Sequence, residues 1–138
     1  MVVIRVKSTS EIASSIDAAY RYAGAHGVYN AQSILGEILG NYYDEKAVIV
    51  KVGSYLIGIA LYRIYPNELH IPEFAVVKQG IGIGTMIVKE LAKIAEENGI
   101  HSLTANYGPG AKGFYDKLGF VENSESLAGN PAALVKRV

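Results

Sequence analysis

One stretch of this chain, residues 73–98, restricts the possible folds more than any other. Four apolar residues at 74–77 predict a buried strand, and the turn after it carries Gly80, Gly82 and Gly84. Apolar residues then recur at helical spacing until Asn98 and Gly99, which are typical of a helix end. Glycines let backbone N–H groups approach a ligand, and a helix N-terminus carries partial positive charge. The stretch is therefore suited to binding a phosphate.

The spacing of the glycines distinguishes between the phosphate-binding loops that such a turn can form. The dinucleotide fingerprint G-x-G-x-x-G needs a glycine where Thr85 or Ile87 stands, and the nucleoside-triphosphate loop needs a Gly-Lys-Ser/Thr triplet that the sequence lacks. The pattern Q/R-x-x-G-x-G/A does fit, with Gln79, Gly82 and Gly84 directly after the strand. An ordinary strand–turn–helix without a ligand is the alternative interpretation.

Length and composition restrict the class of protein. The 138 residues suit one domain over 1–138, and thirteen basic residues balance thirteen acidic ones. This balance argues against a nucleic acid or a membrane surface as a partner bound mainly through charge. The sequence has no apolar run of about 18 residues, no signal-peptide layout at its N-terminus, and no cysteine for a disulfide, a thiolate zinc site or a nucleophile. We therefore expect a cytoplasmic protein.

Periodicity and turn residues predict the element order β-α-α-β-β-β-α-β-α-β-β. This order indicates an α/β (α+β) fold with a mixed sheet of six to seven strands and about four helices. The expected strands are 2–6, 46–52, 55–65, 68–77, 101–106, 120–122 and 132–138. The expected helices are a first one that follows the cap at 8–11 and reaches residue 20, a second over 31–39, a third after residue 83 and a fourth over 111–118.

Two motifs in this order resemble the GNAT superfamily of N-acetyltransferases. Residues 79–84 resemble the loop that binds the pyrophosphate of acetyl-CoA, and residues 111–120, AKGFYDKLGF, resemble the family's A-x-x-F-Y-E-K-L-G-F segment. The resemblance covers nearly the whole chain. It implies the GNAT fold, acetyl-CoA (CoA) as the cofactor, and direct transfer of an acetyl group to a primary amine in a ternary complex.

The resemblance also implies which residues bind the cofactor. In the family the pantetheine arm pairs with the strand before the loop, and a backbone N–H of that strand polarises the thioester carbonyl. The loop backbone and a following hydroxyl hold the pyrophosphate. Asn106 stands near Gly108, where the family usually carries asparagine, and either substitutes for that asparagine or only caps the strand. Lys112 and Lys117 lie near the expected path, either at the 3′-phosphate or merely solvated. The predicted cofactor-binding residues are Ala75, Val76, Val77, Gln79, Gly80, Ile81, Gly82, Ile83, Gly84, Thr85, Asn106 and Phe114.

Acetyl transfer to an amine needs a proton acceptor for the amine and stabilisation of the leaving thiolate. By resemblance Tyr115 is the general acid at the sulfur, and packing on an apolar face is the alternative. His70 and Glu73 are the candidate bases, unless a water chain replaces a dedicated base or both are solvated strand residues. Because they are three positions apart, a regular strand sends them to opposite faces, whereas a bulge changes that parity.

Three classes of function remain open at this point. The first is an N-acetyltransferase that acts on a small-molecule or peptide amine. The second is a non-catalytic acyl-CoA-binding sensor or partner-binding module, and the third is a structural protein. No metal is expected, because three scattered histidines without cysteine lack metal-site spacing. An aromatic acceptor site, core packing or a homodimer interface each fit the tyrosines of the N-terminal half, Tyr20, Tyr22, Tyr29, Tyr42 and Tyr43.

Overall fold

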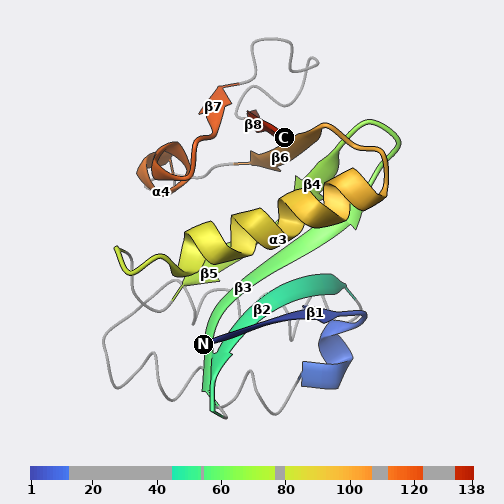
Figure 1. Cartoon of the computed structure of the whole chain (residues 1–138). Coiled ribbons are helices and arrows are strands. Elements are labelled where there is room, and N and C mark those ends of the chain that lie inside the picture. The colour runs from blue at the N-terminus through green and yellow to red at the C-terminus, as the bar shows by residue number, and fades with distance from the viewer. Residues whose placement is uncertain (13–44, 54, 77–79, 107–111, 123–132) are drawn as a thin grey trace.

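A mixed eight-stranded sheet forms the centre of the computed structural model, which describes residues 1–12, 45–53, 55–76, 80–106, 112–122 and 133–138. The strand order is β1-β2-β3-β4-β6-β8-β7, and β5 pairs with β3 beside this path (Figure 1). The strands are β1 Val2–Val6, β2 Lys46–Val52, β3 Tyr55–Ile64, β4 Leu69–Ile71, β5 Phe74–Val76, β6 Ser102–Asn106, β7 Val121–Glu122 and β8 Ala133–Arg137. The helices are a 3-10 helix Thr9–Ile12, α3 Ile83–Glu97 and α4 Lys112–Lys117.

The predicted parallel crossover is present. Strands β4 and β6 pair in parallel, with Leu69 opposite Leu103 and Ile71 opposite Ala105. Helix α3 lies between these two strands in the chain and forms the crossover connection. Every other pairing in the sheet is antiparallel among the described residues. Figure 1 shows α3 lying across one face of the sheet, over β3. The mixed α+β fold expected from the element order is therefore confirmed.

The strand expected over 68–77 is interrupted by a bulge. Opposite β3, His70 pairs with Arg63 and Phe74 pairs with Ala60, so four steps along one strand match three along the other. The extra residue falls at Pro72 and Glu73, where proline has no N–H for the ladder. The carbonyl of Glu73 still accepts a hydrogen bond from the Leu61 N–H at 2.9 Å. The predicted single strand is therefore β4 plus β5, and the sheet has eight strands instead of six to seven.

Most of the first two predicted helices, together with the five tyrosines of the N-terminal half, lies outside the described residues. The described beginning of the first is the 3-10 helix Thr9–Ile12, which starts within the predicted cap. The described strand bounds otherwise differ from the predicted ones by at most one residue at each end, which is within the usual uncertainty of element ends.

The core lies between α3 and one face of the sheet. Helix α3 turns its apolar stripe, including Ile83, Ile87 and Leu91, to this core, where these side chains are almost fully buried. From the strands, Ile71 and Phe74 both join it although they are three positions apart, because the bulge supplies one extra residue. A second, smaller cluster of buried apolar residues has members that alternate, along β2 and β5, with residues of the core under α3. It consists of Val6, Ala47, Ile49, Leu56, Ile59, Leu61 and Ala75.

Both α3 and α4 end in the same glycine-dependent cap. After α3, Gly99 has φ 68°, its N–H donates to Glu96 O, and the Ile100 N–H donates to Ala95 O at 2.8 Å. After α4, Gly119 has φ 91°, and the Phe120 N–H donates to Tyr115 O at 3.1 Å. These are Schellman motifs, which satisfy the last carbonyls of a helix and place a following apolar residue against it.

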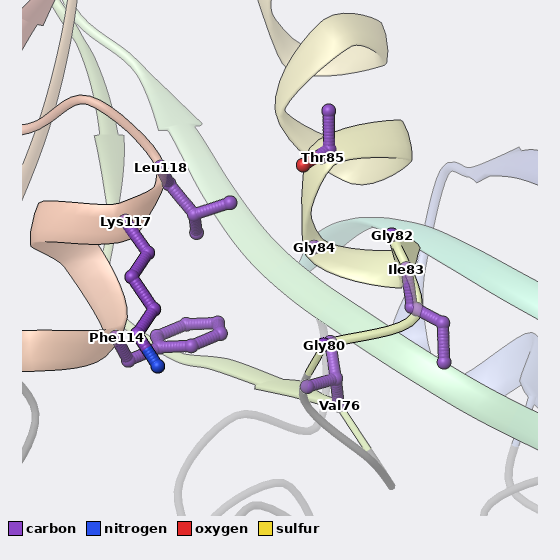
Figure 2. Close-up of a pocket in the computed structure, with 9 residues that line it drawn as sticks. All are labelled: Val76, Gly80, Gly82, Ile83, Gly84, Thr85, Phe114, Lys117 and Leu118. Atoms are coloured by element: carbon purple, nitrogen blue, oxygen red, sulfur yellow. The ribbon is translucent and has the colours of Figure 1, made fainter.

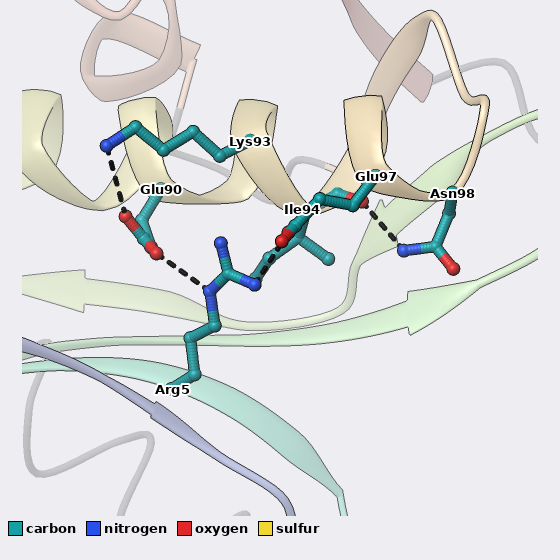
Figure 3. Close-up of polar contacts among 6 residues, drawn as sticks. All are labelled: Arg5, Glu90, Lys93, Ile94, Glu97 and Asn98. Carbon is teal, nitrogen blue, oxygen red and sulfur yellow. Dashed lines mark hydrogen bonds and ion pairs between the residues drawn. The ribbon is translucent and has the colours of Figure 1, made fainter.

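A charged cluster ties β1 to α3 at the surface (Figure 3). The Arg5 guanidinium contacts Glu90 at 2.7 Å and Glu97 at 2.6 Å, and Lys93 lies 3.9 Å from Glu90. Because Arg5 and Glu97 remain 41% and 56% exposed, water and salt screen these ion pairs. The cluster therefore orients β1 against α3 more than it stabilises the fold.

Replacing Arg5 with glutamine should lower the free energy of unfolding by no more than about 1 kcal/mol, as is usual for exposed ion pairs. Urea denaturation at low salt and at about 1 M salt measures this, and the difference should shrink at high salt. Lys93→Gln is the control, because it keeps both Arg5 contacts. A larger loss that persists at high salt would contradict a screened surface role.

Candidate functional site

A pocket of about 270 Å³ opens where β5, the glycine turn, the start of α3 and α4 meet (Figure 2). The glycine turn and the start of α3 belong to the motif at residues 79–84, and α4 belongs to the motif at residues 111–120. Its lining residues are Val76, Gly80, Gly82, Ile83, Gly84, Thr85, Phe114, Lys117 and Leu118. The fold therefore brings the two motifs, about 30 residues apart in the chain, to the same cavity.

The three glycines of the turn are required for two different reasons. Gly80 and Gly82 have φ values of 88° and 86°, a left-handed conformation that glycine adopts without a Cβ penalty. A Cβ on either would meet no atom within 4 Å, so their requirement is conformational and the space beside them is open. Gly84 is helical instead, and a Cβ there would lie 3.3 Å from Leu118, so its requirement is the close approach of α4.

The N-terminus of α3 at this pocket has no side-chain cap among the described residues. Gly82 occupies the N-cap position without a side-chain hydrogen bond, and the first turn contains no acidic residue. The first N–H groups of a helix have no partner within the helix, so they are directed toward a ligand or water. Figure 2 shows the Lys117 side chain alongside Phe114 at the same pocket, where it adds a positive charge. This end of the pocket is therefore suited to an anion.

Strand β5 presents backbone groups on its edge away from β3. Glu73 O accepts from the Leu61 N–H, and hydrogen-bonded pairs recur at every second residue of an antiparallel ladder. The next such pair is therefore Ala75 with Ile59, and the N–H groups of Phe74 and Val76 point away from β3. The parallel partner β6 pairs with β4 at 69–71 and has no described pairing with β5. Among the described residues, the edge of β5 away from β3 therefore carries no strand partner.

Tyr115 lies at the centre of an aromatic cluster. Its ring centroid is 5.3 Å from Phe120, 5.4 Å from Phe114 and 6.1 Å from Phe74, each in an edge-to-face arrangement. The side chain is only 5% exposed. Burial, and secondarily the negative charge of Glu73, raises the pKa of the phenol well above its usual value, so Tyr115 stays protonated. The phenol is therefore a hydrogen-bond donor at any physiological pH.

His70 faces the neighbouring parallel strand. Its Nδ1 atom lies 2.9 Å from Oγ1 of Thr104, its register partner on β6. Burial lowers the pKa of His70; Glu68 partly offsets this, and Arg63 adds to it. The imidazole is therefore neutral near pH 7. Phe74 faces the core, so its neighbour Glu73 faces the other side of the strand. Because the bulge adds one residue, this is the side on which His70 lies.

The pocket includes seven of the predicted cofactor-binding residues, Val76, Gly80, Gly82, Ile83, Gly84, Thr85 and Phe114. Ala75 belongs to the smaller apolar cluster, Ile81 is 49% exposed outside the pocket, and Asn106 is an exposed residue at the end of β6. Val77 and Gln79 lie outside the described residues, and the side chain of Lys112 is not described.

The candidate catalytic residues Tyr115, Glu73 and His70 do not line the pocket themselves. Leu118 also lines the pocket without having been predicted there, although its helical spacing from Phe114 indicates the same face; the contact of Thr104 with His70 has no signal in the sequence.

Two other kinds of site are absent from the described residues. No helix among them has the length and apolarity that crossing a membrane requires. No group of three or more histidine, aspartate or glutamate residues in the described ranges comes close enough together to hold a metal ion.

Comparison with known proteins identifies the family. The sequence profile of the acetyltransferase (GNAT) domain matches residues 16–135. Tetrahymena GCN5 superposes with a TM-score of 0.70 at 11% identity, over 100% of this chain and 96% of that one. The PaiA N-acetyltransferase of Thermoplasma acidophilum, solved with coenzyme A, gives 0.65 at 19% identity over 100% of both chains.

A third solved structure, an aminoglycoside 6′-N-acetyltransferase complexed with coenzyme A, gives a TM-score of 0.61 at 13% identity, over 99% of this chain and 97% of that one. No curated protein matches the chain in sequence. The structural similarities, at such low identity, establish the fold, and the profile match extends over most of the sequence. The chain therefore belongs to the acetyltransferase (GNAT) family.

Proposed function

We propose that this protein is an N-acetyltransferase that moves the acetyl group of acetyl-CoA directly to a primary amine in a ternary complex. One observation carries the proposal: the pocket joins two left-handed glycines, a helix N-terminus whose N-cap glycine has no side-chain cap, and Lys117. Family membership and neighbours solved with coenzyme A support the same ligand. The acceptor that we propose is a small-molecule or peptide amine.

The residues of the pocket fit the chemistry of coenzyme A. A pyrophosphate carries negative charge and many acceptor oxygens, and the first N–H groups of α3 supply donors with a favourable dipole. Lys117 supplies a cation beside them. Because a Cβ at Gly80 or Gly82 would meet no other atom, the backbone there can approach a ligand closely. Val76 offers both an N–H on the open edge of β5 and a side chain in the pocket wall.

The chemistry requires a proton donor for the sulfur and a proton acceptor for the amine. In this proposal Tyr115 donates a hydrogen bond to the departing thiolate, which a phenol of raised pKa can do because it remains protonated. Glu73 and His70 are the candidate acceptors on the amine side, since both lie on the same side of the strand at the bulge. In this proposal the Val76 or Phe74 N–H stabilises the carbonyl oxygen as charge develops on it.

Titration calorimetry with acetyl-CoA and CoA tests the phosphate site, with wild type beside Gly82→Glu. Glutamate at this position strains a left-handed backbone and puts a carboxylate where the pyrophosphate would lie. We expect wild type to bind and Gly82→Glu to bind at least about tenfold more weakly, since one misplaced charge readily exceeds about 1.4 kcal/mol at such a site.

Gly53→Glu is the matched control. Gly53 also has positive φ, 58°, and open space for a Cβ, but it lies in the β2–β3 turn and does not line the pocket. It should bind like wild type. Equal weakening in both variants would indicate general damage to the fold, and no binding by wild type at millimolar cofactor would refute the proposal. Binding without turnover of any amine would identify a non-catalytic acyl-CoA-binding module.

A further inference from the structure

The pair formed by His70 and Thr104 is the most informative contact outside the pocket. The two residues are register partners on the parallel strands β4 and β6, and His70 Nδ1 lies 2.9 Å from Thr104 Oγ1. Both face away from the core under α3, because their neighbours Leu69, Leu103 and Ala105 fill that core. The contact is the middle one of the three paired steps that join β4 and β6, on the face of the sheet away from α3.

The number of available partners decides which of the two residues donates. Thr104 is only 6% exposed, and His70 is the one hydrogen-bond partner of its side chain in the part of the chain that the structure describes. If the hydroxyl accepted from Nδ1–H, its own proton would remain buried without an acceptor, which is costly. If it donates to an unprotonated Nδ1, the buried hydroxyl proton has an acceptor.

The donor assignment also fixes the proton on the other ring nitrogen. A neutral imidazole carries one N–H, so an unprotonated Nδ1 requires a protonated Nε2. Burial keeps the ring neutral, and the charged groups beside it act in opposite directions: Glu68 in the β3–β4 turn raises its pKa, and Arg63 on β3, which is paired with Glu45 at 2.6 Å, lowers it. Nε2–H is then the ring donor that points away from Thr104.

We propose that Thr104 donates a hydrogen bond to Nδ1 of His70 and holds His70 in the Nε2–H tautomer, so that His70 donates to an oxygen of a bound substrate instead of accepting the amine proton. This inference rests on the proposed function and narrows it. Thr104 is a positioning residue, His70 is a substrate-orienting donor, and the proton of the amine leaves through Glu73 or water.

Nitrogen-15 NMR of the histidine side chains tests the tautomer without any need for activity. The chain has three histidines, so the spectrum of His70→Gln assigns the His70 ring. At pH 7.5 we expect wild-type Nδ1 to resonate as an unprotonated nitrogen and Nε2 as a protonated one. The opposite assignment, with Nδ1 protonated, overturns the inference whether or not the protein binds acetyl-CoA.

Substitutions at Thr104 separate positioning from packing. Thr104→Val keeps the shape and removes the donor, so the two nitrogen shifts should move toward each other as both tautomers become populated. Thr104→Ser should restore the wild-type pattern. Ser102→Ala is the control, since Ser102 lies on the same strand and face but donates to Asn67 O. An unchanged His70 spectrum in Thr104→Val would show that Thr104 does not set the tautomer.

Kinetics test the role of the donor once an amine acceptor is known. Glutamine retains an N–H near the position of Nε2 but has no basic group, whereas leucine has neither. We expect the kcat of His70→Gln to exceed that of His70→Leu at least tenfold, and both variants to keep the acid limb of the wild-type pH profile. If His70 were the base, the two variants would lose activity equally and that limb would disappear.

Discussion

Replacing Tyr115 with phenylalanine is expected to lower kcat by about 100-fold, which is within the range of a general acid. The variant keeps the ring contacts with Phe74, Phe114 and Phe120 and loses only the hydroxyl. Binding of CoA, measured by calorimetry, should remain within about twofold, because Tyr115 does not line the phosphate pocket. A loss in kcat with intact binding would place the phenol at the chemical step.

Tyr65→Phe is the control for this experiment, since it removes the hydroxyl of an exposed tyrosine in the β3–β4 turn. Its kcat should match wild type. If Tyr115→Phe also retained full kcat, the phenol would have only a packing role, and the leaving thiolate would depend on other donors.

The raised pKa of Tyr115 also predicts how stability depends on pH. The unfolded chain releases a tyrosine proton near pH 10, whereas the buried phenol holds its proton to higher pH. The unfolded state therefore binds fewer protons above about pH 10, and the contribution of this group, fully present below that pH, is lost as pH rises. Thermal melts at about pH 9 and pH 11 should show a smaller alkaline loss in Tyr115→Phe than in wild type.

Gly58→Val is expected to cause the largest loss of stability, about 3 kcal/mol or more, because it overfills a packed core. A Cβ at Gly58 would lie 2.6 Å from Ile83 Cγ2 and 3.0 Å from Ile87 Cδ1, so α3 would have to move away from β3. We expect the melting temperature to fall by about 10 °C. Since Ile83 also lines the pocket, CoA should bind more weakly as well.

Gly113→Ala is the matched control, because a Cβ there, on α4, meets nothing within 4 Å. It should be neutral or slightly stabilising, as alanine favours a helix over glycine. A double-mutant cycle of Gly58→Ala with Ile83→Ala should show coupling, since truncating Ile83 makes room for the new Cβ. A wild-type melting temperature for Gly58→Val would mean that β3 and α3 do not approach so closely.

The sequence predicted the sheet well because its signals there are local. The apolar runs of β2 and β3, the turn at Gly53 and the helix end at Asn98–Gly99 depend on neighbouring residues. The bulge could not be predicted from the strand itself, because it is defined by register against β3. Pro72 was its one local sign, and proline alone is equally compatible with a strand end.

For the site as well, local motifs were predictable from the sequence and contacts with distant residues were not. The glycine turn and the α4 segment were recognisable as motifs, and the structure brings residues of both to one pocket. The roles of single side chains depend on distant partners that no motif contains. The contact of His70 with Thr104 joins residues 34 positions apart, and the burial of Tyr115 depends on Phe74 from another strand. Such properties require the three-dimensional structure.

The outward N–H groups of β5 have a consequence for mutational experiments. Hydrogen bonds offered by Phe74 and Val76 come from the main chain, so every ordinary substitution at these positions preserves them. An alanine or saturation scan will therefore record only the packing of these side chains and will miss what the edge contributes to ligand binding. Only removal of the N–H itself, through proline or an ester bond in place of the amide at residue 76, reaches that contribution.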